Sequence, residues 1–255
     1  TRCAEDLDTM IQSEGPDTIA AFIAEPVMGA GGVIVPPQTY WEKIQAVLSR
    51  YDILLIADEV ICAFGRTGQM FGSTTFGIKP DVITMSKQIT SSYFPFSAFM
   101  MNERFYEPIA DETNRIGVLG HGFTGGAHPV GAAIALENLR IIKERDLVGN
   151  AALRGNELQV GLAKFTDHPL VGEVRGVGLI AALELVVPKG NAHDLAPGKL
   201  GAHMNQIFQD NGLLSRNMMD AMAFCPPLII DQAQISVMLD IVERSLEILS
   251  SDLAV

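Results

Sequence analysis

Two short apolar runs of the sequence end in side chains that could carry acid–base or amine chemistry. Asp58 and Glu59 follow the run ILLIA at 53–57, and Lys87 follows the run DVITMS at 81–86. Since ligands in open α/β sheets bind at the carboxyl ends of the strands, these side chains are candidate site residues. A buried salt bridge, or a set of merely exposed strand-end residues, is the alternative interpretation.

Two glycine-rich segments form a third feature, GAGG at 29–32 and HGFTGGAH at 121–128. The second precedes an expected helix, so Thr124 and neighbouring backbone N–H groups could hold a phosphate. A plain turn is the alternative for both segments. GAGG lacks the G-x-G-x-x-G spacing of dinucleotide-binding folds, which disfavours a Rossmann-type dehydrogenase.

A lysine, a carboxylate and a phosphate-binding helix end together meet the requirements of pyridoxal phosphate. The lysine can form an imine with the aldehyde of the cofactor, and the carboxylate can hold the protonated ring nitrogen. The lysine must lose its proton to act as nucleophile and base, which desolvation or a cationic neighbour promotes.

The hydrophobic pattern predicts the elements that position these residues. Short apolar runs predict strands at 20–27, 53–60, 81–87 and 96–101, a strand or hairpin at 174–186, and short strands within 213–230. Helical spacing predicts helices at 3–13, 38–50, 128–148, 151–164, 199–211 and 231–250. This rhythm favours an α/β fold with a mainly parallel sheet in residues 1–160, followed by a smaller α+β domain in 161–255.

Composition narrows the function classes. The chain has 255 residues, 48% of them hydrophobic, enough for a sizeable core, and a formal net charge of −12 that disfavours nucleic acid as a partner. The scattered Cys3, Cys62 and Cys225 match no metal or disulfide framework and indicate a reducing cytoplasm. We expect no membrane span and no signal peptide, and the missing start methionine suggests a fragment.

Several segments resemble those of the class III (omega-type) aminotransferases, closest to the pyruvate-dependent omega-transaminases. They occur in that family's order over nearly the whole chain. The segments are FIAEPVMGAGG (22–32), IADEVICAFGRTG (56–68), PDVITMSKQITSSYFPFSA (80–98), GHGFTGGAHPVGAAIALENL (120–139), VRGVGLIAALEL (174–185) and LLSRNMMDAMAFCPPLII (213–230). The resemblance implies a fold-type-I pyridoxal-phosphate transferase, with the large domain partly present.

The resemblance also implies roles for individual residues. Lys87 would be the Schiff-base lysine and proton carrier, and Asp58 would pair with the ring nitrogen. Val60 would pack on one face of the ring, and Glu25 would support the floor of the site. Thr124 would bind the cofactor phosphate, typically in the neighbouring subunit of a homodimer.

For the substrate, the resemblance implies that Arg216 receives a carboxylate and swings away for an amine without one. A guanidinium fork suits a carboxylate, although a surface ion pair is the alternative. We expect Trp41 and Tyr93 to be core or wall residues, His128 to start a helix, and Arg175 to support the small domain.

The sequence departs from the family in three ways. Gln88 and Ser92 stand where glycines are common, and Gly-Gly-Ala-His follows Thr124 where Tyr-Ser-Gly-His is common. The family's N-terminal half, with its Gly-Ser phosphate loop and ring-stacking aromatic, has no counterpart here. We therefore expect these residues alone to bind the cofactor poorly.

The predicted activity is transfer of an amino group from an amine or omega-amino acid to a keto acid such as pyruvate. A second interpretation is another class III enzyme, an aminomutase or a decarboxylating transaminase, which would share Lys87 and Asp58. A third is a non-catalytic fragment that retains the fold as an interaction module.

Overall fold

The computed structural model describes residues 2–187 and 196–253. Within these ranges no helix is long and apolar enough to cross a lipid bilayer. The chain divides into two compact units, and each is described by itself. The first unit comprises Thr1–Pro26, Pro36–Phe64 and Met70–Arg145; the second comprises Val27–Val35, Gly65–Gln69 and Asp146–Val255.

The first unit is built on a four-stranded sheet with the order β1-β2-β3-β4. Its strands are β1 (Ala21–Ala24), β2 (Leu54–Asp58), β3 (Val82–Met85) and β4 (Ala98–Met101). β1, β2 and β3 are parallel, whereas β4 runs antiparallel to β3 at the edge. The predicted α/β fold with a mainly parallel sheet is thus confirmed.

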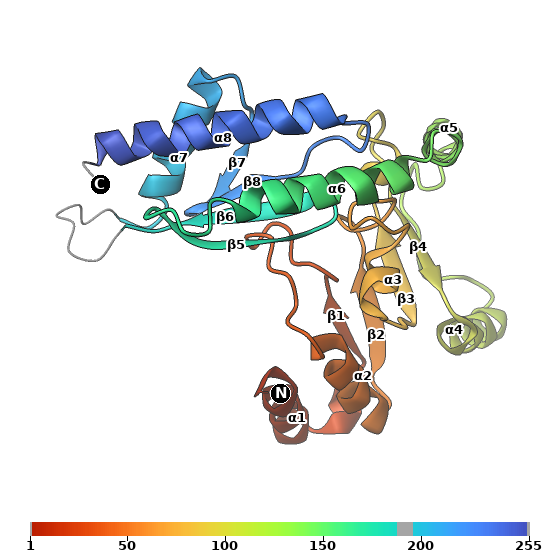
Figure 1. The fold of residues 1–255 in the computed structure, drawn as a ribbon. Coiled ribbons are helices and arrows are strands. Elements are labelled where there is room, and N and C mark those ends of the chain that lie inside the picture. Colours follow the sequence, from red (N-terminus) through yellow and green to blue (C-terminus); the bar gives the residue numbers. More distant parts are fainter. Residues whose placement is uncertain (1, 188–195, 254–255) are drawn as a thin grey trace. The chain divides into compact units, whose positions relative to one another are not determined.

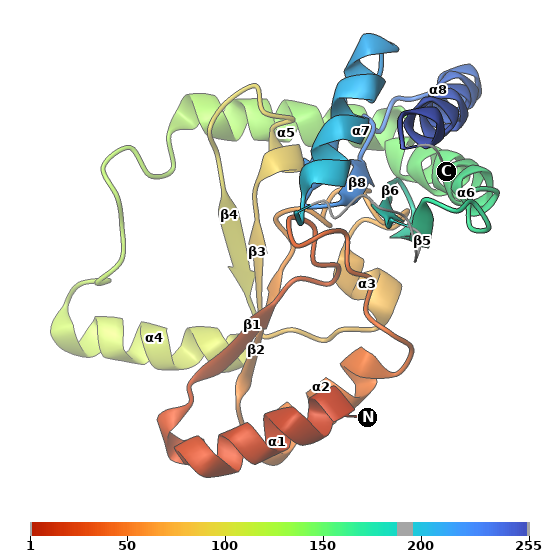
Figure 2. The same ribbon diagram turned by 90° about the vertical axis from the view of Figure 1, so that its left-hand side faces the viewer.

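Two helices cover one face of this sheet (Figures 1 and 2), α1 (Arg2–Glu14) and α2 (Tyr40–Arg50). The buried residues of α2 recur at helical spacing, which is why the sequence pattern located this helix. They pack with α1 and β2 in one core cluster, whose buried members are Leu7, Ile11, Trp41, Ile44, Val47, Leu48, Ile53, Leu55 and Ile78.

The opposite face of the same sheet is less covered. Register pairs share a face, so Ile23, Ile56 and Asp58 on adjacent strands lie on one side with Phe99 of β4. Ile23 is 60% exposed and Phe99 is 48% exposed. Asp58 therefore stands on the more open face of the first sheet.

Helix α4 (Glu103–Ile116) has no counterpart among the predicted elements. None of its residues is buried, and Pro108 inside it is a residue that disfavours a helix in a sequence-based prediction. Local chemistry defines its ends, because the side chain of Asn102 accepts a hydrogen bond from the N–H of Phe105 and Gly117 takes a left-handed conformation after its last turn.

The second unit contains an antiparallel sheet with the order β5-β6-β8-β7. Its strands are β5 (Val171–Val177), β6 (Ile180–Leu185), β7 (Arg216–Met218) and β8 (Ala221–Phe224), and its helices are α6 (Leu147–Ala163), α7 (Lys199–Asp210) and α8 (Gln232–Asp252). α6 and α8 pack against each other (Figure 1), and the central strand β6 is almost wholly buried.

The break between the predicted helices at 128–148 and 151–164 lies earlier in the structure than predicted. α5 (Pro129–Glu144) ends earlier than predicted, and α6 begins at Leu147. The side chain of Asp146, at φ +46°, accepts a hydrogen bond from the N–H of Gly149 and caps α6. Because a capped start cannot lie inside a continuous helix, Asp146 sets the break.

The predicted domain boundary near residue 160 lies inside α6. The chain passes from the first compact unit to the second between Arg145 and Asp146. Since compactness alone does not define an independently folding domain, the division into residues 1–160 and 161–255 stays a prediction.

Candidate active site

Several predicted site residues lie at or just after the carboxyl ends of the parallel strands in the first sheet. Ala24 pairs with Ala57, and Asp58 pairs with Thr84. Glu25, which follows β1 directly, therefore stands level with Asp58 across the parallel strands, and Lys87 follows β3 shortly after Thr84. This is where open α/β sheets bind ligands.

Asp58 is half-buried and held by the turn that follows its own strand. Its Oδ1 accepts a hydrogen bond of 3.0 Å from the backbone N–H of Val60. Among the described residues its carboxylate has no ion-pair partner. A carboxylate oriented in this way can still receive an N–H from a ligand.

Glu59, the neighbouring acid, has a different role. It is fully buried, and its carboxylate accepts hydrogen bonds from the N–H of Gly72 (2.9 Å) and from the N–H and hydroxyl of Ser73 (both 2.6 Å). These donors lie at the start of α3 (Gly72–Phe76), whose N-cap residue offers no side-chain acceptor. Glu59 thus caps a helix, a distinction that spacing alone did not provide.

Lys87 begins a 3₁₀ turn, Lys87–Ile89, directly after β3 and Ser86. Its side chain is exposed and forms no ion pair with any residue that the structure describes. The alternative of a buried Asp58–Lys87 salt bridge is therefore wrong for the described chain. An unpaired amine and an oriented carboxylate at one sheet edge are available to a common ligand.

The turn after Lys87 contains Gln88 and Ser92, the two residues that stand where the family commonly has glycine. Lys87, Ser91 and Ser92 have φ values of +44°, +48° and +64°. Glycine adopts such angles without steric cost, so a glycine at the position of Ser92 would relieve strain there. Gln88 instead uses its side chain, which donates to the hydroxyl of Ser91 at 2.8 Å.

Thr124 lies in the segment at residues 117–128 that joins α4 to α5. Figures 1 and 2 show this segment beyond the edge strand β4, and a ring contact between His121 and Phe99 attaches it there. Thr124 is exposed. Its phosphate-binding role stays a prediction.

His128 starts α5 as predicted. Its side chain accepts a hydrogen bond from the N–H of Val130 at 3.2 Å, and Pro129 occupies the first helical position. Trp41 is a core residue, also as predicted, whereas Tyr93 is 85% exposed.

Arg216 belongs to the second unit, where it begins β7. Its guanidinium is exposed and takes part in no ion pair among the described residues. The alternative of a surface ion pair is therefore wrong within those residues. Arg175, in contrast, donates to the carbonyl of Gly32 and pairs with Glu184 at 2.6 Å, a supporting role that confirms the prediction.

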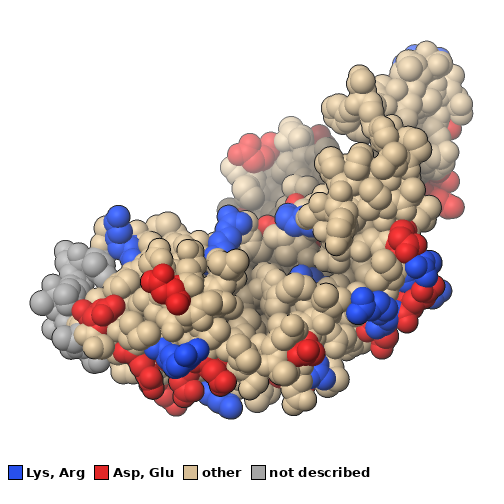
Figure 3. All heavy atoms as spheres, turned by 90° about the horizontal axis from the view of Figure 1, so that it is seen from above, with Lys and Arg blue, Asp and Glu red and all other residues tan. Residues whose placement is uncertain are grey.

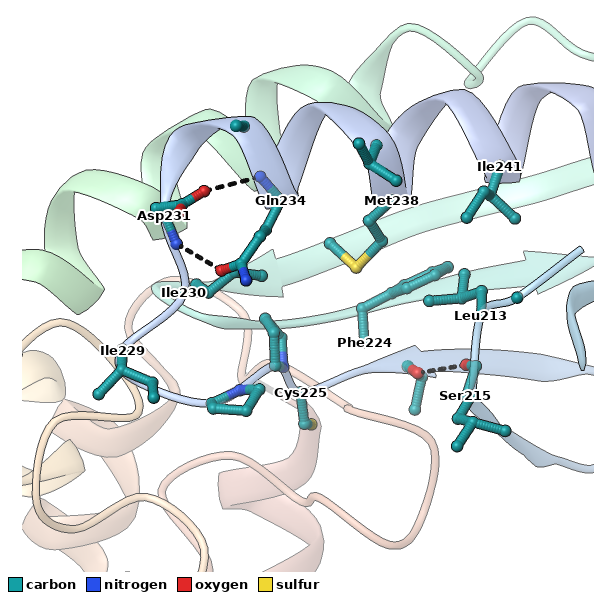
Figure 4. Close-up of a pocket in the computed structure, with 17 residues that line it drawn as sticks. Leu213, Ser215, Phe224, Cys225, Ile229, Ile230, Asp231, Gln234, Met238 and Ile241 are labelled. Carbon is teal, nitrogen blue, oxygen red and sulfur yellow. Dashed lines mark hydrogen bonds between the residues drawn. The ribbon is translucent and has the colours of Figure 1, made fainter.

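The second unit also contains a cavity of about 720 Å³ (Figure 4). Its walls are mainly apolar, and its polar groups bond to one another: Asp231 and Gln234 form a capping box, and Ser215 donates to the carbonyl of Ala223. None of the predicted site residues lines it. We therefore assign it no part in amine chemistry.

Charged residues are interspersed over the face of the molecule that Figure 3 shows, and its described atoms form no broad basic area. That distribution agrees with the acidic composition of the chain.

Comparison with known proteins identifies the family. A profile described as "Aminotransferase class-III" matches residues 1–246. The chain belongs to the class III aminotransferases. This membership confirms the resemblance drawn from the sequence segments and makes pyridoxal phosphate the cofactor of the candidate site.

Class III relatives with different names match almost all of the chain. The gamma aminobutyrate transaminase 1, mitochondrial, of Solanum lycopersicum is 46% identical over 96% of this chain and 48% of its own length. The diaminobutyrate–2-oxoglutarate transaminase of Halomonas elongata is 47% identical over 95% of this chain and 53% of its own length. The chain thus spans about half the length of these relatives.

Solved class III structures share the fold. A structure described as a transaminase with L-ala is 61% identical, with a TM-score of 0.96 over 99% of this chain and 60% of the other. The omega transaminase of Pseudomonas jessenii in complex with PMP is 54% identical, with a TM-score of 0.95 over 99% of this chain and 56% of the other. The expected fold-type-I architecture is thereby confirmed.

The described donor set suits this cofactor. Asp58 offers an oriented carboxylate, and Lys87 offers an amine without an ion-pair partner among the described residues. Sequence reasoning missed one further side chain at this edge, Asn138 of α5, which bonds to the turn after Lys87. No local signal marks Asn138, because its partners lie far away in the sequence.

Proposed function

We propose that this chain is part of a pyridoxal-phosphate-dependent transaminase that moves an amino group from an amine or omega-amino acid to a keto acid such as pyruvate. The carrying observation is that Asp58 and Lys87 lie at the carboxyl ends of the neighbouring parallel strands β2 and β3, neither in an ion pair among the described residues. The whole enzyme would need more chain than these residues.

The proposed roles follow from the chemistry of each side chain. When bound, pyridoxal phosphate supplies an electron sink for the bond at the amine-bearing carbon. Asp58 would keep the ring nitrogen protonated, and the Val60 N–H at 3.0 Å would keep that carboxylate aimed. Lys87 would attach the cofactor and move the proton, while the side chain of Val60 would pack on the ring.

Glu25 would support the floor of the site beside Asp58, with which it is level in the sheet. Arg216 would bind the carboxylate of the keto acid, a role for which its exposed fork is suited. Thr124 would bind a phosphate in the partner subunit of a homodimer.

The first unit supports the proposal of a homodimer through its exposed apolar side chains. Phe123 is 81% exposed, Tyr93 is 85% exposed and Leu136 is 70% exposed. Exposed aromatic and aliphatic side chains near one segment are typical of surfaces that pack against another protein. The scattered positions of Cys3, Cys62 and Cys225, which match no disulfide framework, favour a cytoplasmic protein.

The names of relatives support two keto-acid acceptors. One solved relative is described with L-ala, the amino acid that corresponds to pyruvate, and one curated relative is named for 2-oxoglutarate. We favour pyruvate, and an assay of both acceptors with one amine donor tests this choice. A faster reaction with 2-oxoglutarate would reverse it.

Replacement of the lysine tests the reaction itself. In the complete enzyme, Lys87→Ala should abolish both half-reactions, because the chain then lacks the amine that attaches the cofactor and moves the proton. Lys79→Ala, at another exposed lysine of the first unit, is the matched control and should retain activity. Turnover retained in Lys87→Ala would end the proposal.

Replacement of the arginine tests substrate binding separately. Arg216→Ala should raise the KM for the keto acid by about tenfold or more while leaving the half-reaction with a carboxylate-free amine nearly unchanged. Arg244→Ala, on the exposed side of α8, serves as the control. Equal effects on both half-reactions would argue against a carboxylate-binding role.

A further inference from the structure

We infer that Asn138 of α5 is a positioning residue that holds the turn carrying Lys87 in the conformation that cofactor attachment needs. This inference rests on the proposed function of Lys87. It starts from the backbone of the turn, where Lys87, Ser91 and Ser92 all have positive φ. Residues with a Cβ adopt that conformation only when their surroundings hold them there.

The side chain of Asn138 makes the contacts that can hold this turn. Its Nδ2 donates to the carbonyl of Gln88 at 2.6 Å and to the carbonyl of Ile89 at 3.2 Å. Its Oδ1 accepts from the hydroxyl of Ser91 at 2.8 Å. The donor and the acceptor of one amide group therefore both bond to the residues that follow Lys87.

The contacts around the Ser91 hydroxyl extend this arrangement. Gln88 donates to the same hydroxyl that donates to Asn138, so the two side chains bond through Ser91. The backbone of the turn contributes bonds at or above 3.1 Å, from Ile89, Thr90 and Ser91 to carbonyls two or three positions earlier in the chain. The shorter bonds in the turn come from side chains, and Asn138 makes two of them.

Helix α5 is also held close to this part of the chain. A Cβ at Gly131 would lie 2.6 Å from a ring carbon of Phe96 and 3.0 Å from one of Phe94, so the helix approaches that loop through its glycine. Thr90 is almost completely buried and donates to the carbonyl of Phe94 at 2.7 Å, which ties the loop to the lysine turn. α5 is therefore a fixed support from which Asn138 can act.

Only an amide supplies a donor and an acceptor together at this size. Asn138→Asp keeps the shape and the acceptor for Ser91 but removes the hydrogens that the carbonyls of Gln88 and Ile89 accept. It also places a carboxylate against those carbonyls. Glu137→Gln is the matched control, because Glu137 is the adjacent exposed residue of α5 and, among the residues that the structure describes, pairs only with Arg140.

The experiment compares wild type, Asn138→Asp, Glu137→Gln and Lys87→Ala in the complete protein. Pyridoxal phosphate is added to cofactor-free protein, the Lys87 amine replaces the aldehyde oxygen with release of water, and borohydride traps the product for mass mapping. We expect Asn138→Asp to slow attachment at Lys87 by ten- to a hundredfold, as expected for a misplaced reacting group. Glu137→Gln should match wild type, and Lys87→Ala should trap nothing.

Two readouts separate positioning from a general loss of structure. The circular dichroism of the bound cofactor, measured per molecule attached, should change in Asn138→Asp, whereas melting temperature should stay near that of Glu137→Gln. Hydrogen exchange without cofactor should accelerate about tenfold at the amides of residues 89–93. Should Asn138→Asp fail to fold, Ser91→Ala removes the bonds of its hydroxyl to Asn138 and Gln88 but keeps the bonds of Asn138 to the carbonyls, and it should give the same changes at smaller size.

The outcomes distinguish this inference from the proposed function. If wild type attaches the cofactor at Lys87 and Asn138→Asp does so at the same rate with the same dichroism, Asn138 does not position the lysine. If wild type attaches nothing at Lys87, the proposed function fails. In that case the hydrogen exchange at residues 89–93 still tests whether Asn138 holds the turn. An unchanged exchange rate in Asn138→Asp would overturn that role, and a faster rate would support it.

Discussion

The two sheets of this chain differ in how completely their own helices cover them. In the second unit, Ala181, Ala182 and Leu183 of β6 are each 0% exposed. In the first unit, Ile23 of β1 and Phe99 of β4 lie on the face that carries Asp58, and both are exposed. The central strand of the second sheet is thus buried within the unit, whereas the first sheet has an exposed face at the candidate site.

This difference accords with the lengths of the relatives. The chain spans about half of each curated relative it matches. An apolar face left uncovered is where more protein packs. The proposed site therefore lies where the described residues are least complete, and the following measurements test that contrast.

The largest expected effect concerns the two sheets directly. Leu183→Ala in β6 should lower the free energy of unfolding by about 2–5 kcal/mol, because it leaves a cavity in a packed core. Ile23→Ala, with most of its side chain already in solvent, should cost less than about 1 kcal/mol. Urea unfolding of both variants makes the comparison, and similar losses would mean that the first sheet is covered after all.

A second effect sharpens the contrast within the first sheet. Glu59→Gln should cost about 3 kcal/mol, because a buried carboxylate that accepts hydrogen bonds from Gly72 and Ser73 becomes an amide with fewer acceptors. Asp58→Asn should cost about 1 kcal/mol or less, since it has one hydrogen bond and is half-buried.

Unfolding curves and cofactor retention, measured for both variants, should distinguish the roles of these neighbouring acids. Asp58→Asn should lose cofactor with little loss of stability, whereas Glu59→Gln should lose stability first. If Asp58→Asn proves the more destabilising of the two, Asp58 is structural and its catalytic assignment is in doubt.

A third effect tests how tightly the second unit is packed. A Cβ at Gly155 of α6 would lie 2.3 Å from the backbone of Gly178, so Gly155→Ala should cost about 1–3 kcal/mol although alanine favours helices. Gly122→Ala in the first unit meets open space and should be nearly neutral. Thermal denaturation distinguishes them, and a stable Gly155→Ala would show that α6 can move away.

The smallest effect is a dependence on pH in the second unit. Burial lowers the pKa of His168 below its ordinary value of 6.5, and its Nδ1 accepts a hydrogen bond from the N–H of Leu170. Its stabilising contribution is thus present above pH 6.5 and is lost as the pH falls through the lower pKa of the folded state.

His168→Asn keeps an acceptor near that N–H but removes the titration. The difference in stability between pH 7 and pH 5 should therefore be slightly smaller in His168→Asn than in wild type. An unchanged difference would assign the pH dependence to other groups.

Local pattern in the sequence was enough to predict several elements of the fold. Apolar runs located β1, β2 and β3, helical spacing located α2 and α8, and the strand ends and family segments gave Asp58 and Lys87 as candidate site residues. These signals can be detected in the sequence because the spacing of apolar residues follows directly from which face of an element is buried. The parallel arrangement of β1, β2 and β3 followed from the same rhythm.

Features that depend on contacts between residues far apart in the chain could be read from the folded structure alone. It showed that Glu59, unlike its neighbour Asp58, caps α3, which begins more than ten positions later. It also placed Asn138 against a turn 50 positions earlier. It also revealed α4, a helix that contains Pro108 and buries no side chain. Contacts of this kind arise when the chain folds back on itself, and local pattern carries no record of them.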